Sequence, residues 1–348
     1  MLELRNVTKT VGATEHIRDV SLTLQHGSLN VLLGPTLSGK TSLMRLMAGL
    51  DVPTSGSVWF DGKDVTGIPV QKRNVAMVYQ QFINYPAMTV YENIASPLRV
   101  AGTERAKIDK EVRNAAALLK LTPFLDRTPL SLSGGQQQRT ALARAIVFDP
   151  PLLLMDEPLG ALDKKLREWL QLEIKRIHRE LGTTFVYVTH DQEEALVLSD
   201  RIAVFNQGRI EQIGTGRQLY DEPETLFVGK FVGDSTILRG AASTSGNETA
   251  IEIEGRKVAA AKRLPDGAKP VMLLRPEKLS LARRGKGGQD RNTLPGRIGE
   301  AIYLGSGSKY EVVLADTSKA IVRSTLDAET FAIGDEVDLI FAGSDVKL

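Results

Sequence analysis

The chain has 348 residues, a formal net charge of +2, 42% hydrophobic residues, 25% charged residues and no cysteine. This composition is typical of an ordinary globular protein, and the length predicts two or three domains. The near balance of charge argues against nucleic acid or an anionic membrane surface as the main partner, and the missing cysteines exclude disulfides and thiolate metal sites. The N-terminus lacks an apolar signal segment, and no apolar run approaches the ~18 residues that span a bilayer. We therefore expect a soluble chain whose membrane role, if it has one, comes through another subunit.

Residues 1–30 read as strands, because apolar and polar residues alternate around Leu2 and Leu4 and again from Val20 to Leu24. This alternation predicts an antiparallel hairpin with one solvated face. Later apolar runs predict strands over residues 57–60 and 75–79, and helical spacing of apolar residues predicts a helix over 104–121.

The next feature is a glycine-rich loop that lies between a predicted strand at 29–33 and a predicted helix at 42–50. It has the P-loop pattern G-x-x-x-x-G-K-T, in that strand–loop–helix context, at Gly34, Pro35, Thr36, Leu37, Ser38, Gly39, Lys40 and Thr41. The glycines let the backbone turn its N–H groups toward phosphate oxygens at a helix N-terminus. Lys40 would place a positive charge on the β- and γ-phosphates, and the Thr41 hydroxyl would ligate Mg²⁺. The loop therefore predicts a nucleotide site.

A further helix is predicted to begin at Ser133, because Ser133 and Gln136 match the S-x-x-Q capping box. The remaining elements of this part are a buried strand at 152–155, a helix at 164–181 capped by Gly182, a buried strand at 185–189 and a hairpin over 202–213. Strands and helices thus alternate from about residue 29 to 205, which predicts a mainly parallel sheet.

The sequence pattern changes near residue 236. From there to residue 348, short stretches of alternating apolar and polar residues are separated by closely spaced glycine turns. This spacing is typical of a small all-β barrel or sandwich. We therefore predict two domains, residues 1–235 with an α/β fold and residues 236–348 with an all-β fold.

Three polar residues follow buried strands at the edge where open α/β sheets place their sites. Asp156 could hold Mg²⁺ directly or through water, and Glu157 beside it could accept a proton from an attacking water. His190 could donate to the γ-phosphate, although a lone histidine is more often structural. A P-loop alone does not separate kinases, GTPases, helicases and transport ATPases, so the second half of the site decides between them.

The stretch Leu132-Ser133-Gly134-Gly135-Gln136 makes the resemblance specific. Together with the P-loop, the 152–157 strand, Gly160 to Asp163 and Thr189 to Asp191, it resembles the ATPase subunit of an ATP-binding-cassette (ABC) transporter over residues 1 to about 230. The resemblance implies an α/β P-loop domain with a helical subdomain at about 88–150, and it implies ATP and Mg²⁺ as cofactors.

The same resemblance implies residue roles at the matching positions. Gln80 would lie near Mg²⁺ and the membrane subunits, and Glu157, His190 and Gln80 would be catalytic. Mg²⁺ would be held by Thr41, Gln80 and Asp156. The loop of Ser133, Gly134, Gly135 and Gln136 would meet the γ-phosphate of ATP on a second ATPase subunit, and Asp163 would contact the nucleotide from the D-loop. Each nucleotide would therefore be enclosed by two chains, as a homodimer or a paralogous heterodimer.

The C-terminal residues indicate which kind of ABC ATPase the chain resembles. Leu274 to Glu277, Gly296 to Ile298 and Tyr303 to Gly305 resemble the OB-like (TOBE) accessory domain of maltose-type importer ATPases. The segment 80–94, in the first predicted domain, is also similar to those sugar and polyol importers. This implies an ATPase that energises import of a sugar, a polyol such as glycerol or a sugar-phosphate-like solute. Its partners would be two transmembrane permease subunits and, indirectly, a periplasmic or extracellular solute-binding protein, and it would lie on the cytoplasmic face of the inner membrane. Polyamine and iron importers use similar ATPases, and a soluble non-transport ABC ATPase is a further alternative.

One residue departs from the pattern of that family. Its members usually carry an aromatic residue in the segment that corresponds to Lys9–Gly12, where it stacks on adenine, and the matching residue here is Val11. Stacking of about 0.5–1.5 kcal/mol would then be absent or supplied elsewhere, with His16 as one candidate. Pairing with a different ATPase chain, with unequal sites, is another possibility.

Overall fold

The structure is a computed structural model, and it describes the chain apart from residues 81–82, 161–163, 246–247, 254, 261–266, 268, 287–291 and 348. The chain divides into two compact units, Met1–Asp221 and Glu222–Leu348, which are described separately below. The boundary at 235/236 that the sequence suggests stays a prediction. In the part of the chain that the structure describes, no helix is long and apolar enough to cross a membrane.

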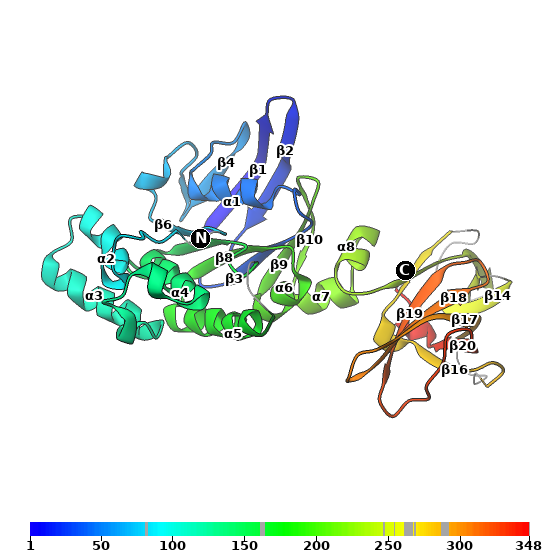
Figure 1. The fold of residues 1–348 in the computed structure, drawn as a ribbon. Coiled ribbons are helices and arrows are strands. Elements are labelled where there is room, and N and C mark those ends of the chain that lie inside the picture. The colour runs from blue at the N-terminus through cyan, green and yellow to red at the C-terminus, as the bar shows by residue number, and fades with distance from the viewer. Residues whose placement is uncertain are drawn as a thin grey trace. The chain divides into compact units, whose positions relative to one another are not determined.

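The first unit alternates strands and helices as the sequence predicts (Figure 1). Its elements are β1 (Leu2–Val11), β2 (Thr14–Thr23), β3 (Leu29–Leu33), α1 (Lys40–Ala48), β4 (Ser55–Phe60), β5 (Lys63–Asp64), β6 (Val75–Val78), α2 (Val90–Val100), α3 (Arg105–Leu118), α4 (Gly134–Ile146), β7 (Leu152–Asp156), α5 (Lys164–Leu181), β8 (Thr184–Thr189), α6 (Gln192–Leu198), β9 (Arg201–Asn206), β10 (Arg209–Gly214) and α7 (Gly216–Asp221).

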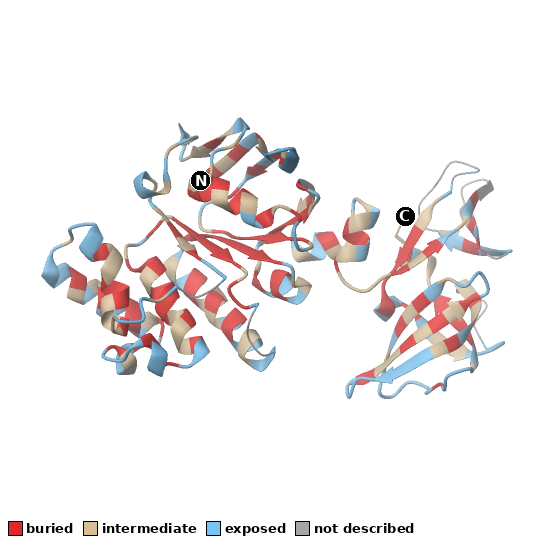
Figure 2. Cartoon of the chain, turned by 45° about the horizontal axis from the view of Figure 1, so that its top comes forward, coloured by how far each residue is buried: buried red, intermediate tan, exposed pale blue. Residues whose placement is uncertain are grey.

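The central sheet of this unit has the strand order β10-β9-β3-β8-β7-β6. Strands β9, β3, β8, β7 and β6 are mutually parallel, and β10 closes one edge as the antiparallel partner of β9. Every residue of β3, β7 and β8 is buried, which explains their continuous apolar sequences, because both faces of the sheet are covered (Figure 2). The prediction of a mainly parallel sheet is confirmed, and its strand ends carry the candidate site.

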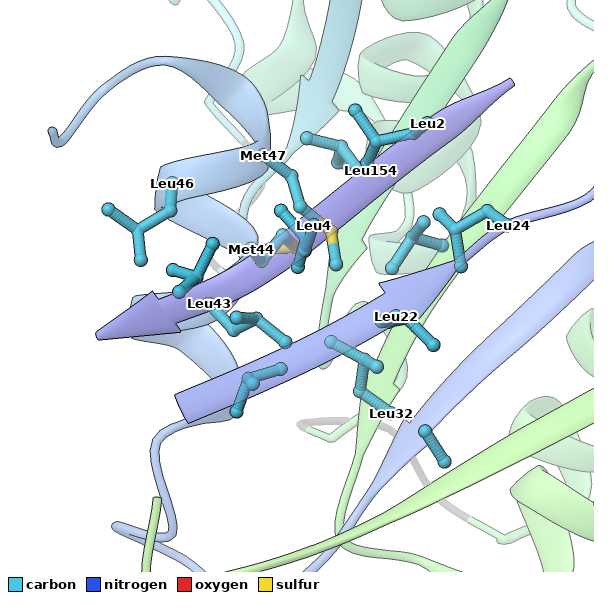
Figure 3. Close-up of a cluster of buried hydrophobic side chains, with 14 of the residues drawn as sticks. Leu2, Leu4, Leu22, Leu24, Leu32, Leu43, Met44, Leu46, Met47 and Leu154 are labelled. Carbon is cyan, nitrogen blue, oxygen red and sulfur yellow. The ribbon is translucent and has the colours of Figure 1, made fainter. Parts of the chain in front are cut away.

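An antiparallel sheet of order β2-β1-β4-β5 lies over α1, on the far side of that helix from the central sheet. The predicted β1–β2 hairpin is confirmed, with Leu4 paired opposite Leu22. Its apolar side chains face inward and form one core with α1 and the central sheet, as Figure 3 shows for Leu2, Leu4, Leu22, Leu24, Leu32, Leu43, Met44, Leu46, Met47 and Leu154. This core fixes α1, and therefore the loop before it, against the strand ends.

Local capping chemistry sets several helix ends. At α4, the Ser133 side chain accepts from the backbone N–H of Gln136 and the Gln136 side chain accepts from the backbone N–H of Ser133, so the predicted capping box is confirmed. The predicted helix over 104–121 is shorter, Arg105–Leu118. Helix α2 was not predicted by the sequence pattern, because Pro97 interrupts it, yet a second capping box between Thr89 and Glu92 starts it.

The second unit begins with α8 (Leu226–Phe231) and, apart from short 3₁₀ turns at Pro276–Lys278 and Gly343–Asp345, its regular structure is strands, which confirms the predicted all-β tail. The strands are β11 (Thr236–Arg239), β12 (Ala241–Ser245), β13 (Glu248–Ile253), β14 (Arg256–Ala260), β15 (Val271–Leu274), β16 (Ser280–Arg283), β17 (Asn292–Tyr303), β18 (Gly307–Leu314), β19 (Lys319–Thr325) and β20 (Glu336–Phe341). They form sheets of order β11-β15, β12-β13-β14 and β16-β20-β17-β18-β19 around one apolar core.

Candidate functional site

The P-loop connects the C-terminal end of β3 to the first residue of α1. Gly39 has a φ of 108°, and a Cβ at this position would lie 2.6 Å from the backbone oxygen of His16. A Cβ on Gly34 would lie 2.2 Å from the backbone oxygen of Phe205. Neither distance is compatible with a side chain, so both glycines are required for the loop to lie this close to its neighbours.

The loop presents buried polar groups that suit a phosphate chain. Lys40 is buried, and its Nζ donates to the backbone oxygens of Gly34 at 2.9 Å and Pro35 at 2.7 Å. Burial lowers the pKa of Lys40, and Glu157 and Asp156 oppose that shift by their negative charge. Ser38 Oγ is buried and has no hydrogen-bond partner among the described residues. Within those residues no side chain caps the N-terminus of α1, so its N–H groups are available to an anion.

Two adjacent carboxylates, one at the last residue of β7 and one just after it, take different partners. Asp156 is buried, and Thr41 Oγ1 donates to its Oδ1 at 3.1 Å. Burial raises the pKa of Asp156, and the Thr41 hydrogen bond opposes this. Oε2 of Glu157 lies 3.2 Å from Nδ1 of His190 and accepts from Nε2 of Gln80 at 3.5 Å. The structure therefore brings the predicted residues Thr41, Asp156, Glu157, Gln80 and His190 together at one edge of the sheet.

A cavity of about 700 Å³ extends from these groups, a volume within the usual range for small-molecule sites. Its phosphate-side lining is residues 36–42 with Gln80, Asp156 and Glu157. The rest of the lining is Thr14, Glu15, His16, Arg18, Gln207 and Gly208. Apart from His16, the sequence pattern missed this second group, since β2 and the β9–β10 turn meet only in the fold; the Asn206-Gln207-Gly208 turn was predicted, but not its place at the cavity.

Val11 is about half exposed and, among the described residues, does not belong to the lining of that cavity. The structure therefore places His16, and not Val11, at the cavity wall. Residues 133–136 are also absent from this lining within the described part of the chain: Ser133 and Gly134 are exposed, and Ser133 Oγ is engaged in its capping box. Asp163 lies outside the described residues.

A separate groove of about 330 Å³ lies between β6, α2 and α4. It is lined mainly by apolar side chains, including Ile83, Tyr85 and Val100, which are exposed. Arg144 also lines it, with its guanidinium 4.9 Å from the centre of the Tyr85 ring, and burial lowers the pKa of Arg144. Nη1 of Arg144 is buried without a hydrogen-bond acceptor among the described residues.

Two protein families match this chain, one in each of its two units. The family described as ABC transporter matches residues 17–160, and the TOBE domain family matches residues 272–347. The dimeric ATP-binding cassette MJ0796, in a post-hydrolysis state bound to ADP and Pi, is 32% identical with a TM-score of 0.55, covering 62% of this chain and 98% of that chain. The fold of cbiO1 from Clostridium perfringens is also similar, with a TM-score of 0.60 over 64% of this chain and 91% of that chain, at 24% identity. The fold and site therefore define an ABC-type ATPase domain followed by an all-β TOBE domain.

Relatives that match almost the whole chain identify its family more closely. The spermidine/putrescine import ATP-binding protein PotA of Rubrobacter xylanophilus is 41% identical over 95% of this chain and 88% of its own length. PotA of Thermobifida fusca is 43% identical over 98% of this chain and 90% of its own length. PotA 2 of Pseudomonas aeruginosa is 41% identical over 97% of this chain and 95% of its own length. The chain belongs to the family of ATP-binding subunits of ABC importers, so it is an ATPase that works with permease subunits.

These relatives correct one prediction. The tail motifs and the 80–94 segment led us to expect a maltose- or glycerol-phosphate-type importer of sugars or polyols, and that expectation is wrong, because the relatives are named for polyamine import. The motifs in question lie in the TOBE domain and in a segment beside the groove, and neither is a feature of sugar importers alone.

Proposed function

We propose that this chain hydrolyses ATP to drive import of a polyamine such as spermidine or putrescine. The observation that carries the proposal is the 41–43% identity to three polyamine-import ATP-binding proteins over at least 95% of the chain. Both of the chain's domains are included in those matches, so the likeness is not confined to the ATPase motifs that all ABC proteins share.

The test is an uptake assay in the host that carries the gene. Deleting the gene should abolish uptake of labelled spermidine or putrescine and leave maltose uptake unchanged. The wild-type gene should restore uptake, whereas a Lys40→Ala variant should not, because it lacks the ammonium at the phosphate site. Unchanged uptake of both polyamines, with loss of another solute, would reject the polyamine assignment and leave the ATPase assignment intact.

We propose that the P-loop, residues 34–41, holds the ATP phosphates. Support comes from the orphaned Ser38 hydroxyl, the buried Lys40 ammonium and the uncapped start of α1, all of which suit an anion. His16 and Arg18 line the same cavity, and we propose that the base lies against them. His16 is therefore a better candidate than Val11 for contact with adenine.

The residues present also fit Mg²⁺. Thr41 and Asp156 offer hard oxygen donors that are 3.1 Å apart, and Gln80 lines the same cavity. Among the described residues no group of three or more His, Cys, Asp or Glu side chains could hold a metal by itself. This agrees with an ion that takes its remaining ligands from nucleotide phosphates and water. When bound, Mg²⁺ would neutralise charge on the phosphates.

Glu157 is the proposed general base, since its carboxylate lies at the cavity and is exposed enough to meet water. His190 and Gln80 both contact that carboxylate, and we propose that they orient it and the attacking water. This assignment uses only side chains of one chain.

The signature loop supports a dimer. Ser133 to Gln136 lie at the N-terminus of a helix, a second anion-binding end, and in the described part of this chain they stay outside the P-loop cavity. We propose that they meet ATP held by a second ATPase subunit, identical or paralogous, and that the D-loop residue Asp163 acts at the same interface.

The groove beside β6 is the proposed contact with the permease subunits. It combines exposed apolar side chains with the guanidinium of Arg144, so an apolar segment that carries a carboxylate would suit it. Docking there would hold the chain on the cytoplasmic face of the membrane, and a solute-binding protein would act through the permease on the other side.

A further inference from the structure

A buried acid network lies directly behind the contact between Glu157 and His190. Glu194 on α6 is only 3% exposed, and its Oε2 accepts from the hydroxyls of Tyr187 at 2.9 Å and Thr189 at 2.8 Å. Asp191, the residue after His190, caps α6 by accepting from the N–H groups of Glu193 and Glu194. Two carboxylates therefore flank the His190 turn, one of them buried.

A single cation from a different helix serves both acids. Nη1 of Arg167, on α5, donates to Oδ2 of Asp191 at 3.2 Å, and Nε of Arg167 lies 3.8 Å from Oε1 of Glu194. Arg167, His190, Glu157 and both acids line one small cavity of about 30 Å³, so the network lies against the reacting side chains.

We propose that Arg167 is a positioning residue for ATP hydrolysis, and the proposal rests on the catalytic roles proposed above for Glu157 and His190. Arg167 ties the first turns of α5 to the cap of α6, and His190 is the residue immediately before that cap. The tie fixes the backbone of the His190 turn and so keeps Nδ1 of His190 at 3.2 Å from Oε2 of Glu157. Arg167 acts through that turn, and it forms ion pairs with Asp191 and Glu194.

The chemistry of the network favours this role over simple support of the fold. Glu194 already has two hydroxyl donors, so its second oxygen is the one that needs Arg167. Asp191 already has two backbone donors as a helix cap, so the fold of α6 does not depend on Arg167. Arg167 supplies a side-chain link between α5 and the turn. Loss of that link should therefore affect catalytic geometry more than nucleotide binding.

The test compares Arg167→Met with Arg176→Met in the full chain. Arg176 is the matched control, because it lies on the same helix, is about equally exposed (31% against 29%) and is also ion-paired, but away from the site. We expect Arg167→Met to lower kcat by up to about 100-fold, the effect of a ~1 Å misplacement, with KM for ATP within threefold of the wild type. Arg176→Met should leave both unchanged, and Arg167→Lys should recover part of kcat.

A double variant separates positioning from stability. Arg167→Met leaves the Glu194 charge buried beside an apolar side chain, so it should also lower the unfolding midpoint, and adding Glu194→Gln should restore that midpoint. We expect kcat to stay low in the restored double variant, because the link to Asp191 is still missing. Recovery of kcat together with stability, or normal kcat in Arg167→Met, would overturn the proposal. Normal turnover in Glu157→Gln would instead reject the catalytic assignment on which it rests.

Discussion

Replacing Thr41 by valine tests the connection between the P-loop and β7 before any nucleotide is added. Valine has the shape of threonine and a similar helix propensity, so the change removes the hydroxyl and little else. Thr41 Oγ1 donates to Asp156, which is buried with only 9% of its surface exposed. A hydrogen bond to a charged group contributes about 1.5–3 kcal/mol, and the length of 3.1 Å places this one near the lower limit.

We therefore expect Thr41→Val to lower the free energy of unfolding of the first unit by about 1.5 kcal/mol. The assay is urea unfolding followed by tryptophan fluorescence. Both tryptophans of the chain, Trp59 and Trp169, lie in Met1–Asp221, so the signal reports on that unit alone.

Thr41→Ser is the matched control, because it keeps the hydroxyl and loses a methyl group from an exposed residue. It should unfold within about 0.5 kcal/mol of the wild type, as surface substitutions usually do. If the two variants unfold at the same urea concentration, or Thr41→Val matches the wild type, the hydrogen bond does not hold the loop to β7. A second readout is ligand stabilisation. MgATP should raise the urea midpoint of the wild type more than ATP with a chelator does. In Thr41→Val the two ligands should raise the midpoint equally.

The remaining predictions concern catalysis, assembly, base binding and pH. Glu157→Gln should slow hydrolysis by about 10²- to 10⁴-fold while ATP still binds, so that closed dimers accumulate in size-exclusion chromatography; normal turnover would remove Glu157 from the role of base. Ser133→Arg should leave ATP binding to the monomer intact but abolish hydrolysis, and unchanged activity would contradict a site shared between chains. His16→Ala should weaken ATP binding by about 2- to 10-fold through loss of contact with the base, without changing binding of inorganic triphosphate, and equal ATP affinity would place the base elsewhere. Burial raises the pKa of Glu194 above its ordinary value of 4.5 in the folded state, so the folded chain binds that proton more tightly than the unfolded chain. The resulting stability is fully present below pH 4.5 and is lost as the pH rises through the raised pKa, so the wild type should lose stability relative to Glu194→Gln as the pH rises above 4.5, as measured by urea midpoints.

Features that depend on neighbouring residues could be predicted from the sequence. The alternation around Leu2 and Leu4 predicted strand β1, because one face of that strand packs on α1. The capping box of Ser133 and Gln136 predicted the start of α4, because its hydrogen bonds join residues three apart. Helix α2 escaped prediction because Pro97 falls inside it, and packing against α3 and α4 decides its structure.

Features that depend on distant residues could be predicted only where a motif marks them. The P-loop and the Asp156-Glu157 pair were found because phosphate and Mg²⁺ chemistry restricts the residue types that can serve there. Arg18 and Arg167 were missed, since each joins the site through contacts with other elements and neither has a local pattern. An acidic residue directly after His190, at the start of a helix, is the one local signal that could have indicated a partner for Arg167.

The solute was assigned wrongly for a related reason. The motifs of this chain record what it does with ATP, and solute selectivity belongs to side chains that contact the solute, which in an importer lie in the permease and the binding protein. The identity to polyamine-import proteins extends over at least 95% of the chain, so it draws on many positions that no single motif contains.

Backbone strain at Glu157 explains how two adjacent carboxylates reach different partners. Successive side chains of a strand point to opposite faces, and the strand register ends with Asp156 opposite Val188. Glu157 then adopts a φ of 43°, a left-handed conformation that costs a non-glycine residue about 1–2 kcal/mol. Hydrogen bonds hold it there, since its N–H donates to Val188 and its carbonyl accepts from Gly160. The turn leaves Asp156 against Thr41 and directs Glu157 to His190. The free energy stored in this one residue therefore separates the proposed metal ligand from the proposed base.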